Sequence, residues 1–183
     1  MPIVNDPAEI GSDLDRGTSL TIGNFDGVHQ GHNRLIRMVK DRAAQYGLTS
    51  LAVTFDPHPL RVIRGSSPPF ITTTPQKLKL LKAQGLDYVL CLTFTPQMAQ
   101  LSPEEFVERY LVRGLSCRHL VIGYDYTFGK GGKGNYQTLR DLGEKYGFET
   151  ERVEALTVNG EVVSSTRIRD LIQQGRVNEA KPL

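Results

Sequence analysis

Short apolar runs of strand length alternate along this chain with longer stretches whose apolar residues recur at helical spacing. The run Leu-Ala-Val-Thr-Phe at residues 51–55 is continuous, as expected for a strand that is covered on both faces. Because strands and helices alternate, the pattern predicts an α/β fold with a doubly wound, parallel sheet. Strands are predicted at residues 19–23, 51–55, 88–94, 119–123, 150–153 and 158–163, with a short edge strand near Ile3, and helices are predicted to begin near residues 31, 74, 102, 135 and 164.

Local start and turn signals support these boundaries. Ser102 and Glu105 form a capping box with a proline just inside it. Thr74 is predicted to cap the helix that has a proline in its first position. Asn159 and Gly160 lie between apolar residues and predict a tight β-hairpin.

The stretch between the first strand and the first long helix carries three glycines and two histidines. Gly23, Gly27 and Gly31 recur at spacing four, so the backbone can turn tightly and approach a ligand closely. His29 and His32 lie where the helix begins. A helix start favours anions, and imidazoles there can bond to phosphate oxygens, with a bound anion favouring their protonated form. This stretch predicts a phosphate site, although two solvated histidines would also fit the His-x-x-His spacing alone.

Two further unusual stretches follow predicted strands. The Asp-Pro-His-Pro turn at residues 56–59 ends one strand, and the glycine-rich loop at residues 124–134 follows another. In a doubly wound sheet, ligands bind beyond the carboxyl ends of the strands, where the strand order reverses. We therefore expect both stretches and the histidine turn to surround one ligand site. A plain turn would explain His58 nearly as well, and Tyr126 and Phe128 would also suit a core beside a mobile loop.

The segment Ser-Ser-Thr-Arg-Ile-Arg at residues 164–169 opens the last predicted helix. Hydroxyls and free N–H groups at a helix start, together with Arg167 and Arg169 in its first turn, make a clamp suited to a polyphosphate. On its own, the segment would also fit a helix cap followed by two surface arginines. Combined with the histidine turn, it predicts a site for a nucleoside triphosphate.

Composition narrows the class of protein. A length of 183 residues predicts one domain with a sizeable core. The 22 basic and 20 acidic residues give a net charge of +2, which offers no electrostatic argument for nucleic acid or membrane partners. Cys91 and Cys117 are expected to be reduced, and no Cys/His group has the spacing of a zinc site. We recognise no signal peptide and no membrane-spanning apolar run, and therefore expect a cytoplasmic protein.

The histidine turn matches a known pattern. Its sequence, Thr-Ile-Gly-Asn-Phe-Asp-Gly-Val-His-Gln-Gly-His at residues 21–32, resembles the signature of the nucleotidyltransferase superfamily and, in this wording, the adenylyltransferase module of bacterial FAD synthetases. Residues 164–169 are similar to the Ser-Ser-Thr-x-x-Arg segment of these enzymes. Residues 123–129 are similar to their flavin-binding loop, Gly-x-Asp-Phe-x-Phe-Gly, except that Tyr126 stands where phenylalanine is commoner. With the turn at residues 56–59, the resemblance covers nearly the whole chain in order.

The resemblance implies a Rossmann-like, doubly wound sheet of the nucleotidyltransferase type and the transfer of AMP from ATP to FMN, giving FAD and pyrophosphate. It implies that His29 and His32 meet the α- and β-phosphates of ATP. Arg167 and Arg169 would hold the β- and γ-phosphates. Magnesium is expected to be carried mainly by the ATP phosphates, so no metal ligand is assigned in the protein. The implied catalytic residues are His29, His32 and Arg167; the implied ATP-binding residues are Gly23, Asn24, Phe25, Asp26, Gly31, Ser164, Ser165, Thr166 and Arg169; the implied FMN-binding residues are His58, Asp125, Tyr126 and Phe128.

Members of this family are usually bifunctional and carry a riboflavin kinase domain after this module. This chain stops at residues 181–183, so we expect one nucleotidyltransferase domain over residues 1–183 and no kinase domain in them. Acceptors other than FMN remain open, namely pantetheine phosphate, nicotinate mononucleotide and glycerol phosphate, because the phosphate motifs do not separate them. A nucleotide-binding module without turnover also remains open, although it would not need both histidines and the arginines. A class I tRNA synthetase fragment would carry a Lys-Met-Ser-Lys-Ser-like loop, which the sequence lacks.

Overall fold

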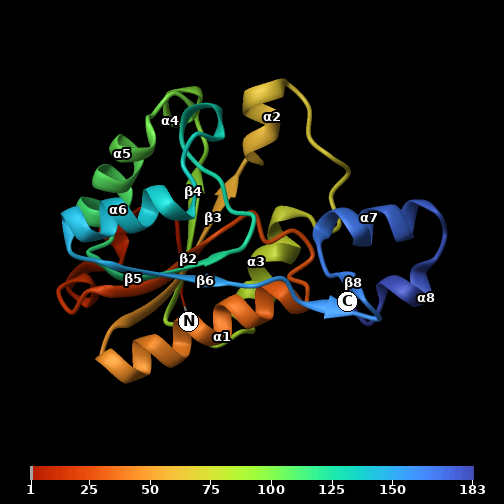
Figure 1. Ribbon diagram of the computed structural model, residues 1–183, viewed down its shortest axis with the longest axis horizontal. Coiled ribbons are helices and arrows are strands. Elements are labelled where there is room, and N and C mark those ends of the chain that lie inside the picture. The colour runs from red at the N-terminus through yellow and green to blue at the C-terminus, as the bar shows by residue number, and fades with distance from the viewer. Residues whose placement is uncertain (1) are drawn as a thin grey trace.

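The computed structural model describes residues 2–183 and shows, within them, a six-stranded sheet with helices on both faces (Figure 1). The strand order is β1-β4-β3-β2-β5-β6, and every neighbouring pair runs parallel. The predicted doubly wound α/β sheet, with its short edge strand at Ile3, is confirmed. The strands are β1 (Ile3–Val4), β2 (Thr18–Ile22), β3 (Thr49–Asp56), β4 (Tyr88–Thr93), β5 (Cys117–Gly123) and β6 (Glu149–Val153).

Helices connect the strands and cover both faces of the sheet (Figure 1). The described helices are α1 (Gln30–Tyr46), α2 (Pro59–Arg64), α3 (Thr74–Lys82), α4 (Pro96–Ala99), α5 (Pro103–Phe106), which continues as a π-helical segment (Val107–Gly114), α6 (Tyr136–Tyr146), α7 (Ser165–Gln173) and α8 (Val177–Ala180). Short 3-10 turns lie at Pro7–Glu9, Gly11–Leu14 and Lys130–Gly132.

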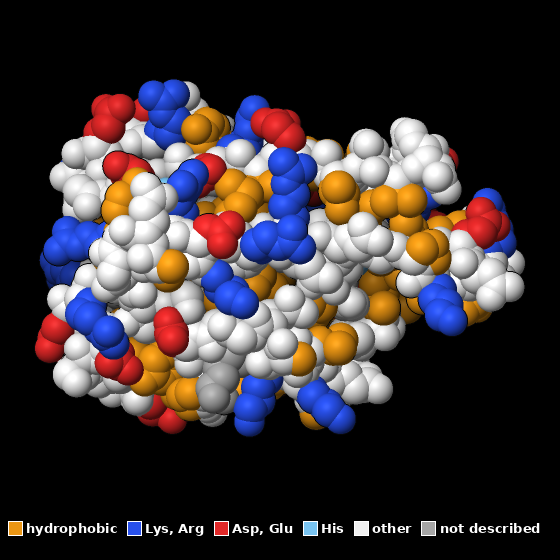
Figure 2. Space-filling model, turned by 90° about the horizontal axis from the view of Figure 1, so that it is seen from below, with side chains coloured by type: hydrophobic (Ala, Val, Ile, Leu, Met, Phe, Trp, Pro, Cys, Tyr) orange, Lys and Arg blue, Asp and Glu red, His pale blue; other side chains and the backbone are white. Residues whose placement is uncertain are grey.

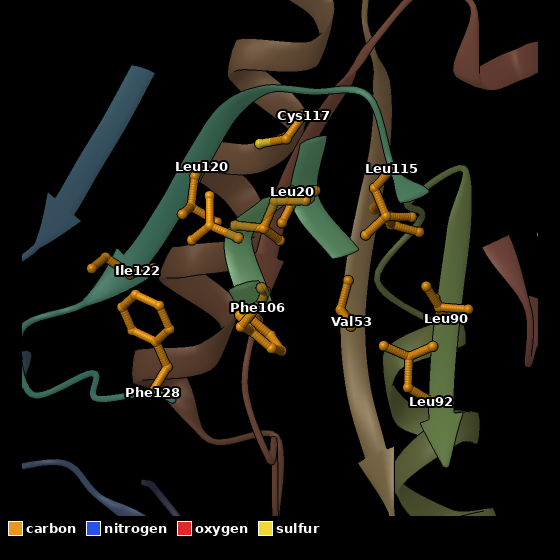
Figure 3. Packing of buried hydrophobic residues seen from close by; sticks show 14 of the residues in the cluster. Leu20, Val53, Leu90, Leu92, Phe106, Leu115, Cys117, Leu120, Ile122 and Phe128 are labelled. Carbon is orange, nitrogen blue, oxygen red and sulfur yellow. The ribbon is translucent and has the colours of Figure 1, made fainter. Parts of the chain in front are cut away.

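Alternate strand residues point to two separate apolar cores, as expected for a sheet that is buried on both faces. On one face, Ile36 of α1 and Leu81 of α3 pack in the same cluster as Val89 of β4. On the other face, α5 and α6 pack over the larger cluster. Figure 3 shows this cluster, with the ring of Phe128 next to Ile122 at its border. The glycine-rich loop therefore has one residue anchored in the core.

The structure corrects some predicted boundaries. The cap of α3 is Thr73, not Thr74, because Gln76 lies three residues after Thr73 and completes a capping box with it. The Ser102 capping box is confirmed. The hairpin at Asn159 and Gly160 is also confirmed, and it joins β7 (Thr157–Val158) to β8 (Glu161–Val162) as a small sheet separate from the main one. Helices α2 and α4 were not foreseen, since six and four residues are too few to show a helical period.

The C-terminal elements form a lobe beyond the end of the main sheet. The hairpin, α7 and α8 lie together at the right of Figure 1 and pack around a cluster that includes Val163, Ile168 and Leu183. Figure 2 shows basic, acidic and hydrophobic side chains interspersed over the face it presents. Of the helices in residues 2–183, none is long and apolar enough to cross a membrane.

Candidate active site

The strand order reverses at β2, because the chain adds β3 and β4 on one side of it and β5 and β6 on the other. At the carboxyl ends of these strands lies a cavity of about 1030 Å³. The histidine turn after β2, the turn after β3, the glycine-rich loop after β5 and the start of α7 all border it, as the sequence predicts. Every residue predicted to bind or react lines this cavity except Arg167: the lining ones are His29, His32, Gly23, Asn24, Phe25, Asp26, Gly31, Ser164, Ser165, Thr166, Arg169, His58, Asp125, Tyr126 and Phe128.

The two histidines form a stacked pair at the start of α1. His29 is the N-cap residue, and its Nδ1 accepts the backbone N–H of His32 at 3.3 Å. The two rings stack with centroids 3.6 Å apart, and His32 also meets the Phe25 ring edge-on at 5.1 Å. Gly31 leaves room for this stack, since a Cβ at this position would lie 3.1 Å from the His29 ring, closer than an ordinary contact. The sequence spacing thus produces a fixed pair with a known acceptor nitrogen rather than two solvated side chains.

The turn that presents this pair has an unusual backbone. Phe25 and Val28 have φ values of 50° and 42°, in the left-handed region that side chains other than glycine seldom adopt. Val28 is β-branched, so its conformation is strained, and it is held by its burial in the core. Strain of this kind at a turn lining a cavity is typical of sites that hold a ligand in one geometry.

Both histidines are expected to be neutral at neutral pH, because the pKa of each is lowered. Burial lowers the pKa of His29 to about 4, against the opposing charge of Asp26. Burial, together with the charge of His29, lowers the pKa of His32 well below its ordinary value. With Nδ1 of His29 accepting a hydrogen bond, its ring proton resides on Nε2, which is free to donate. The pair therefore offers N–H donors without the cost of storing buried charge.

Asp26 and Arg169 form an ion pair in the wall of the cavity. Arg169 Nη2 lies 2.9 Å from Asp26 Oδ2, and Arg169 Nε donates to the carbonyl of Pro69 at 2.9 Å. Asp26 also accepts the backbone N–H groups of Ile71 at 3.1 Å and Thr72 at 2.9 Å. Burial acts to raise the pKa of Asp26, but these hydrogen bonds outweigh it and hold the pKa below its usual range. Asp26 lines the cavity mainly as an anchor for Arg169 and for residues 71–72.

Arg167 is directed away from the cavity. Its Nη1 donates to the carbonyls of Glu161 at 3.2 Å and Val158 at 3.4 Å, and its Nη2 lies 2.5 Å from Glu161 Oε2. Residues two positions apart on a helix face roughly opposite directions, so Arg167 and Arg169 diverge. We expected both arginines to flank one polyphosphate, but only the Arg169 side chain lines the cavity. The Arg167 side chain binds the hairpin instead.

The hydroxyl residues at the start of α7 have separate tasks. Ser164 is the N-cap, and its Oγ accepts the N–H of Arg167 at 3.2 Å. Ser165 Oγ donates to the backbone carbonyl of Asp26 at 2.9 Å, which joins α7 to the histidine turn. Thr166 is exposed at the cavity wall. Two of the three hydroxyls predicted to meet phosphate thus hold the site together.

The glycine-rich loop is anchored by an aromatic pair. Phe128 is buried, stacks on Tyr126 with centroids 5.8 Å apart, and contacts Phe106 at 5.8 Å. A Cβ at Gly134 would lie 2.5 Å from the Phe128 ring, so this glycine permits the loop to close on it. Phe128 and Tyr126 therefore pack on the core and also line the cavity. The sequence allowed either a core role or a ligand-binding role for them, and these two roles are compatible. Asp125 is exposed at the rim.

The opposite wall begins with His58. His58 caps α2, its Nδ1 accepting the N–H of Leu60 at 3.2 Å, and its ring lies 5.9 Å from that of Phe70. Burial, then the positive charges of Lys77 and Arg169, lower the pKa of His58. Helix α2 supplies the apolar part of this wall, which was not predicted from the sequence. The sequence signal that could have predicted α2 was His58 as a helix cap followed by Pro59 in the first helical position.

Apolar side chains complete the cavity on the side of α2 and α4. The lining ones that the sequence did not single out include Leu60, Val62, Ile63, Phe94 and Met98. Among residues 2–183, no group of three or more His, Cys, Asp or Glu side chains is placed to hold a metal ion. The cavity thus joins a polar end, with the histidines and Arg169, to an apolar end. Such a shape suits a ligand with phosphates and aromatic rings.

Comparisons with known proteins agree with this geometry. A sequence model of the FAD synthetase family matches residues 12–167. Over 157 residues, the chain is 36% identical to the bifunctional riboflavin kinase/FMN adenylyltransferase of Pseudomonas fluorescens, covering 86% of this chain and 50% of that protein. The chain spans about half the length of the curated relatives it matches.

Solved structures share the fold. One described as a macrolide-efflux protein from Streptococcus pneumoniae superposes with a TM-score of 0.82 at 29% identity, over 97% of this chain and 59% of that chain. Pantothenate synthetase from Thermus thermophilus superposes with a TM-score of 0.58 at 18% identity, over 98% of this chain and 80% of that chain, which shows likeness of fold alone.

Proposed function

The chain belongs to the FAD synthetase family, and on that premise we propose that it transfers the adenylyl group of ATP to FMN, giving FAD and pyrophosphate. The observation that carries the proposal is the single cavity that joins the stacked histidines and Arg169 to an aromatic loop. One end suits a triphosphate and the other suits a planar ring system. In the proposed reaction, ATP supplies the triphosphate and FMN supplies the planar ring system.

The reaction needs positioning and charge stabilisation more than acid–base chemistry. In the proposed step, an oxygen of the FMN phosphate attacks the α-phosphorus of ATP in line, and the bond to the β-phosphate oxygen breaks to release pyrophosphate. A phosphate monoester has its second pKa near about 6, so FMN is already largely ionised at neutral pH. No general base is required, and we assign none. The protein supplies alignment and stabilises negative charge.

We assign the phosphate contacts from the polar end of the cavity. His29 and His32 would donate hydrogen bonds to the α- and β-phosphates, and protonation of the pair would follow as the anion arrives. Arg169, held by Asp26, would meet the β- and γ-phosphates. Magnesium enters as part of the MgATP substrate. The Asp26 carboxylate already pairs with Arg169 and accepts backbone hydrogen bonds, which supports leaving the metal to the phosphates of the nucleotide.

The flavin side is assigned to the apolar end. Tyr126 and Phe128 would present ring faces or edges to the isoalloxazine, while His58 and Asp125 border it. Because the curated relatives are about twice as long and are named as bifunctional, we also propose that this module works beside a riboflavin kinase part of a longer protein. We place the reaction in the cytoplasm, where the buried thiols of Cys91 and Cys117 stay reduced.

The proposal is tested by an acceptor panel. The purified chain is incubated with MgATP and, in separate reactions, FMN, pantetheine phosphate, nicotinate mononucleotide and glycerol phosphate, and products are resolved by chromatography. The proposal expects FAD and pyrophosphate in equal amounts from FMN and little product from the others. Faster adenylylation of another acceptor would reassign the substrate, and ATP binding without any product would favour a binding module.

A further inference from the structure

A lysine is buried beneath the edge of the sheet that carries the cavity. Lys77 lies one turn into α3 and is 8% exposed, and its Nζ donates to the backbone carbonyl of Phe55 at 3.0 Å. Lysine is almost never buried to this degree unless its ammonium group is paired. The burial of Lys77 therefore has a cost that its contact with the end of β3 must offset.

The same helix holds the next residue of that strand. Thr74 Oγ1 donates to Asp56 Oδ1 at 2.7 Å, so α3 ties the last two residues of β3 from one side. Two residues later the chain reaches His58, whose Nδ1 accepts the N–H of Leu60 and caps α2. With Nδ1 used in this way, neutral His58 carries its proton on Nε2. The end of β3 is thus held by its ladder to β4 on one side and by Lys77 and Thr74 of α3 on the other, two residues before His58.

We propose that Lys77 is a positioning residue for the flavin side of the site: through the Phe55 carbonyl it holds the end of β3, and thereby His58, where an FMN molecule is bound. The inference rests on the proposed function. Lys77 does not line the cavity, so it acts through His58 and not by contact with the substrate. Loosening the strand end would displace His58 and the start of α2, whereas the histidine pair after β2 would keep its own contacts.

The charges around His58 provide an independent readout. Burial lowers its pKa most, the cations Lys77 and Arg169 lower it further, and Asp26 opposes them. The pKa of Lys77 is itself lowered by burial, with the charges of Cys91, Asp56 and Asp26 opposing that shift. Removing the Lys77 cation should raise the pKa of His58 toward its ordinary value. That shift would establish that the Lys77 ammonium lies close enough to His58 to act on it, and the FMN affinity then decides whether Lys77 positions the ring.

The test compares Lys77→Met with Lys79→Met, a matched control on an exposed position of the same helix. Histidine ring signals are titrated by NMR, with His58 identified from the spectrum of His58→Gln, and dissociation constants for FMN and ATP are measured separately. For Lys77→Met we expect a higher pKa of His58 and FMN binding weakened about tenfold, as for a lost hydrogen bond from a charged group. ATP binding should change by less than about twofold. Lys79→Met should match the parent, and Lys77→Arg should retain much of the FMN affinity.

Unchanged FMN affinity in a folded Lys77→Met protein would overturn the proposal, even if the pKa of His58 moved. An equal loss of FMN and ATP affinity would also overturn it, because it would indicate general loosening. If Lys77→Met does not fold, Thr74→Val is used to loosen the second tie, and it must weaken FMN binding selectively. A parent that binds FMN but makes no FAD would refute the proposed function while the binding and NMR readouts still decide the role of Lys77.

Discussion

Lowering the pH should destabilise the protein through His29. The pKa of its imidazole is 6.5 when the chain is unfolded, and burial lowers that pKa to about 4 in the folded protein. The unfolded state therefore binds a proton in this interval that the folded state does not, and stability falls as the pH falls. From about pH 7 to about pH 5, this single group should remove about 2 kcal/mol from the free energy of unfolding.

The assay is urea denaturation of the parent and of His29→Gln at both pH values. Glutamine does not titrate, so the variant should lose about 2 kcal/mol less than the parent over the same interval. The other histidines and the carboxylates contribute to both proteins and cancel to first order, apart from the coupling of His32 to His29. Equal acid losses in the two proteins would refute the conclusion that the half-buried His29 is neutral in the folded protein.

The lowered pKa values of His29 and His32 should also make ATP binding depend on pH. A triphosphate beside the pair should favour the protonated imidazole, so ATP binding at about pH 6 should take up protons from the buffer. Calorimetric titrations of ATP in two buffers of different ionisation enthalpy would show this uptake as a difference in apparent enthalpy. Identical apparent enthalpies would mean that the nucleotide phosphates do not reach His29 or His32.

Four substitutions test other parts of the site. Arg169→Lys should weaken apparent ATP affinity about tenfold in steady-state kinetics, since lysine lacks the planar guanidinium that pairs with Asp26. Arg167→Lys should change that affinity by less than about twofold, because the Arg167 guanidinium binds the hairpin. Gly134→Ala should lower the free energy of unfolding by roughly 1–3 kcal/mol in urea titrations, because the new Cβ would overlap the Phe128 ring. His32→Ala should reduce FAD formation at least about a hundredfold, with FMN affinity retained in a fluorescence titration. A parent-like Arg169→Lys, Gly134→Ala or His32→Ala would each contradict the role given to that residue.

Much of the sheet could be predicted because its strands are buried on both faces. The continuous apolar run at residues 51–55 lies within β3, and the glycine signal at residues 159–160 indicated the hairpin. In a parallel sheet the carboxyl ends of the strands lie at one edge, so the turns after β2, β3 and β5 could be predicted to lie together there. Helix α2 was missed because its six residues are shorter than two helical turns.

The finer arrangement of the site could not be obtained from local pattern. Arg167 and Arg169 look equivalent in sequence, but their guanidinium groups go to different places because of their angle around α7 and the hairpin beside it. The role of Asp26 depends on the backbone N–H groups of Ile71 and Thr72, about 45 residues away in sequence. Contacts of such sequence separation leave no periodic signal.

Adenylyl transfer to FMN is decided by following the α-phosphorus of ATP. The purified chain is given FMN and MgATP labelled at the α-phosphorus, and the products are separated after a single turnover. If FMN accepts the adenylyl group, the label appears in FAD and pyrophosphate carries none. Label in free AMP with unlabelled flavin would contradict this transfer, because the phosphorus would then have been transferred to water and the cavity would not hold FMN as the acceptor.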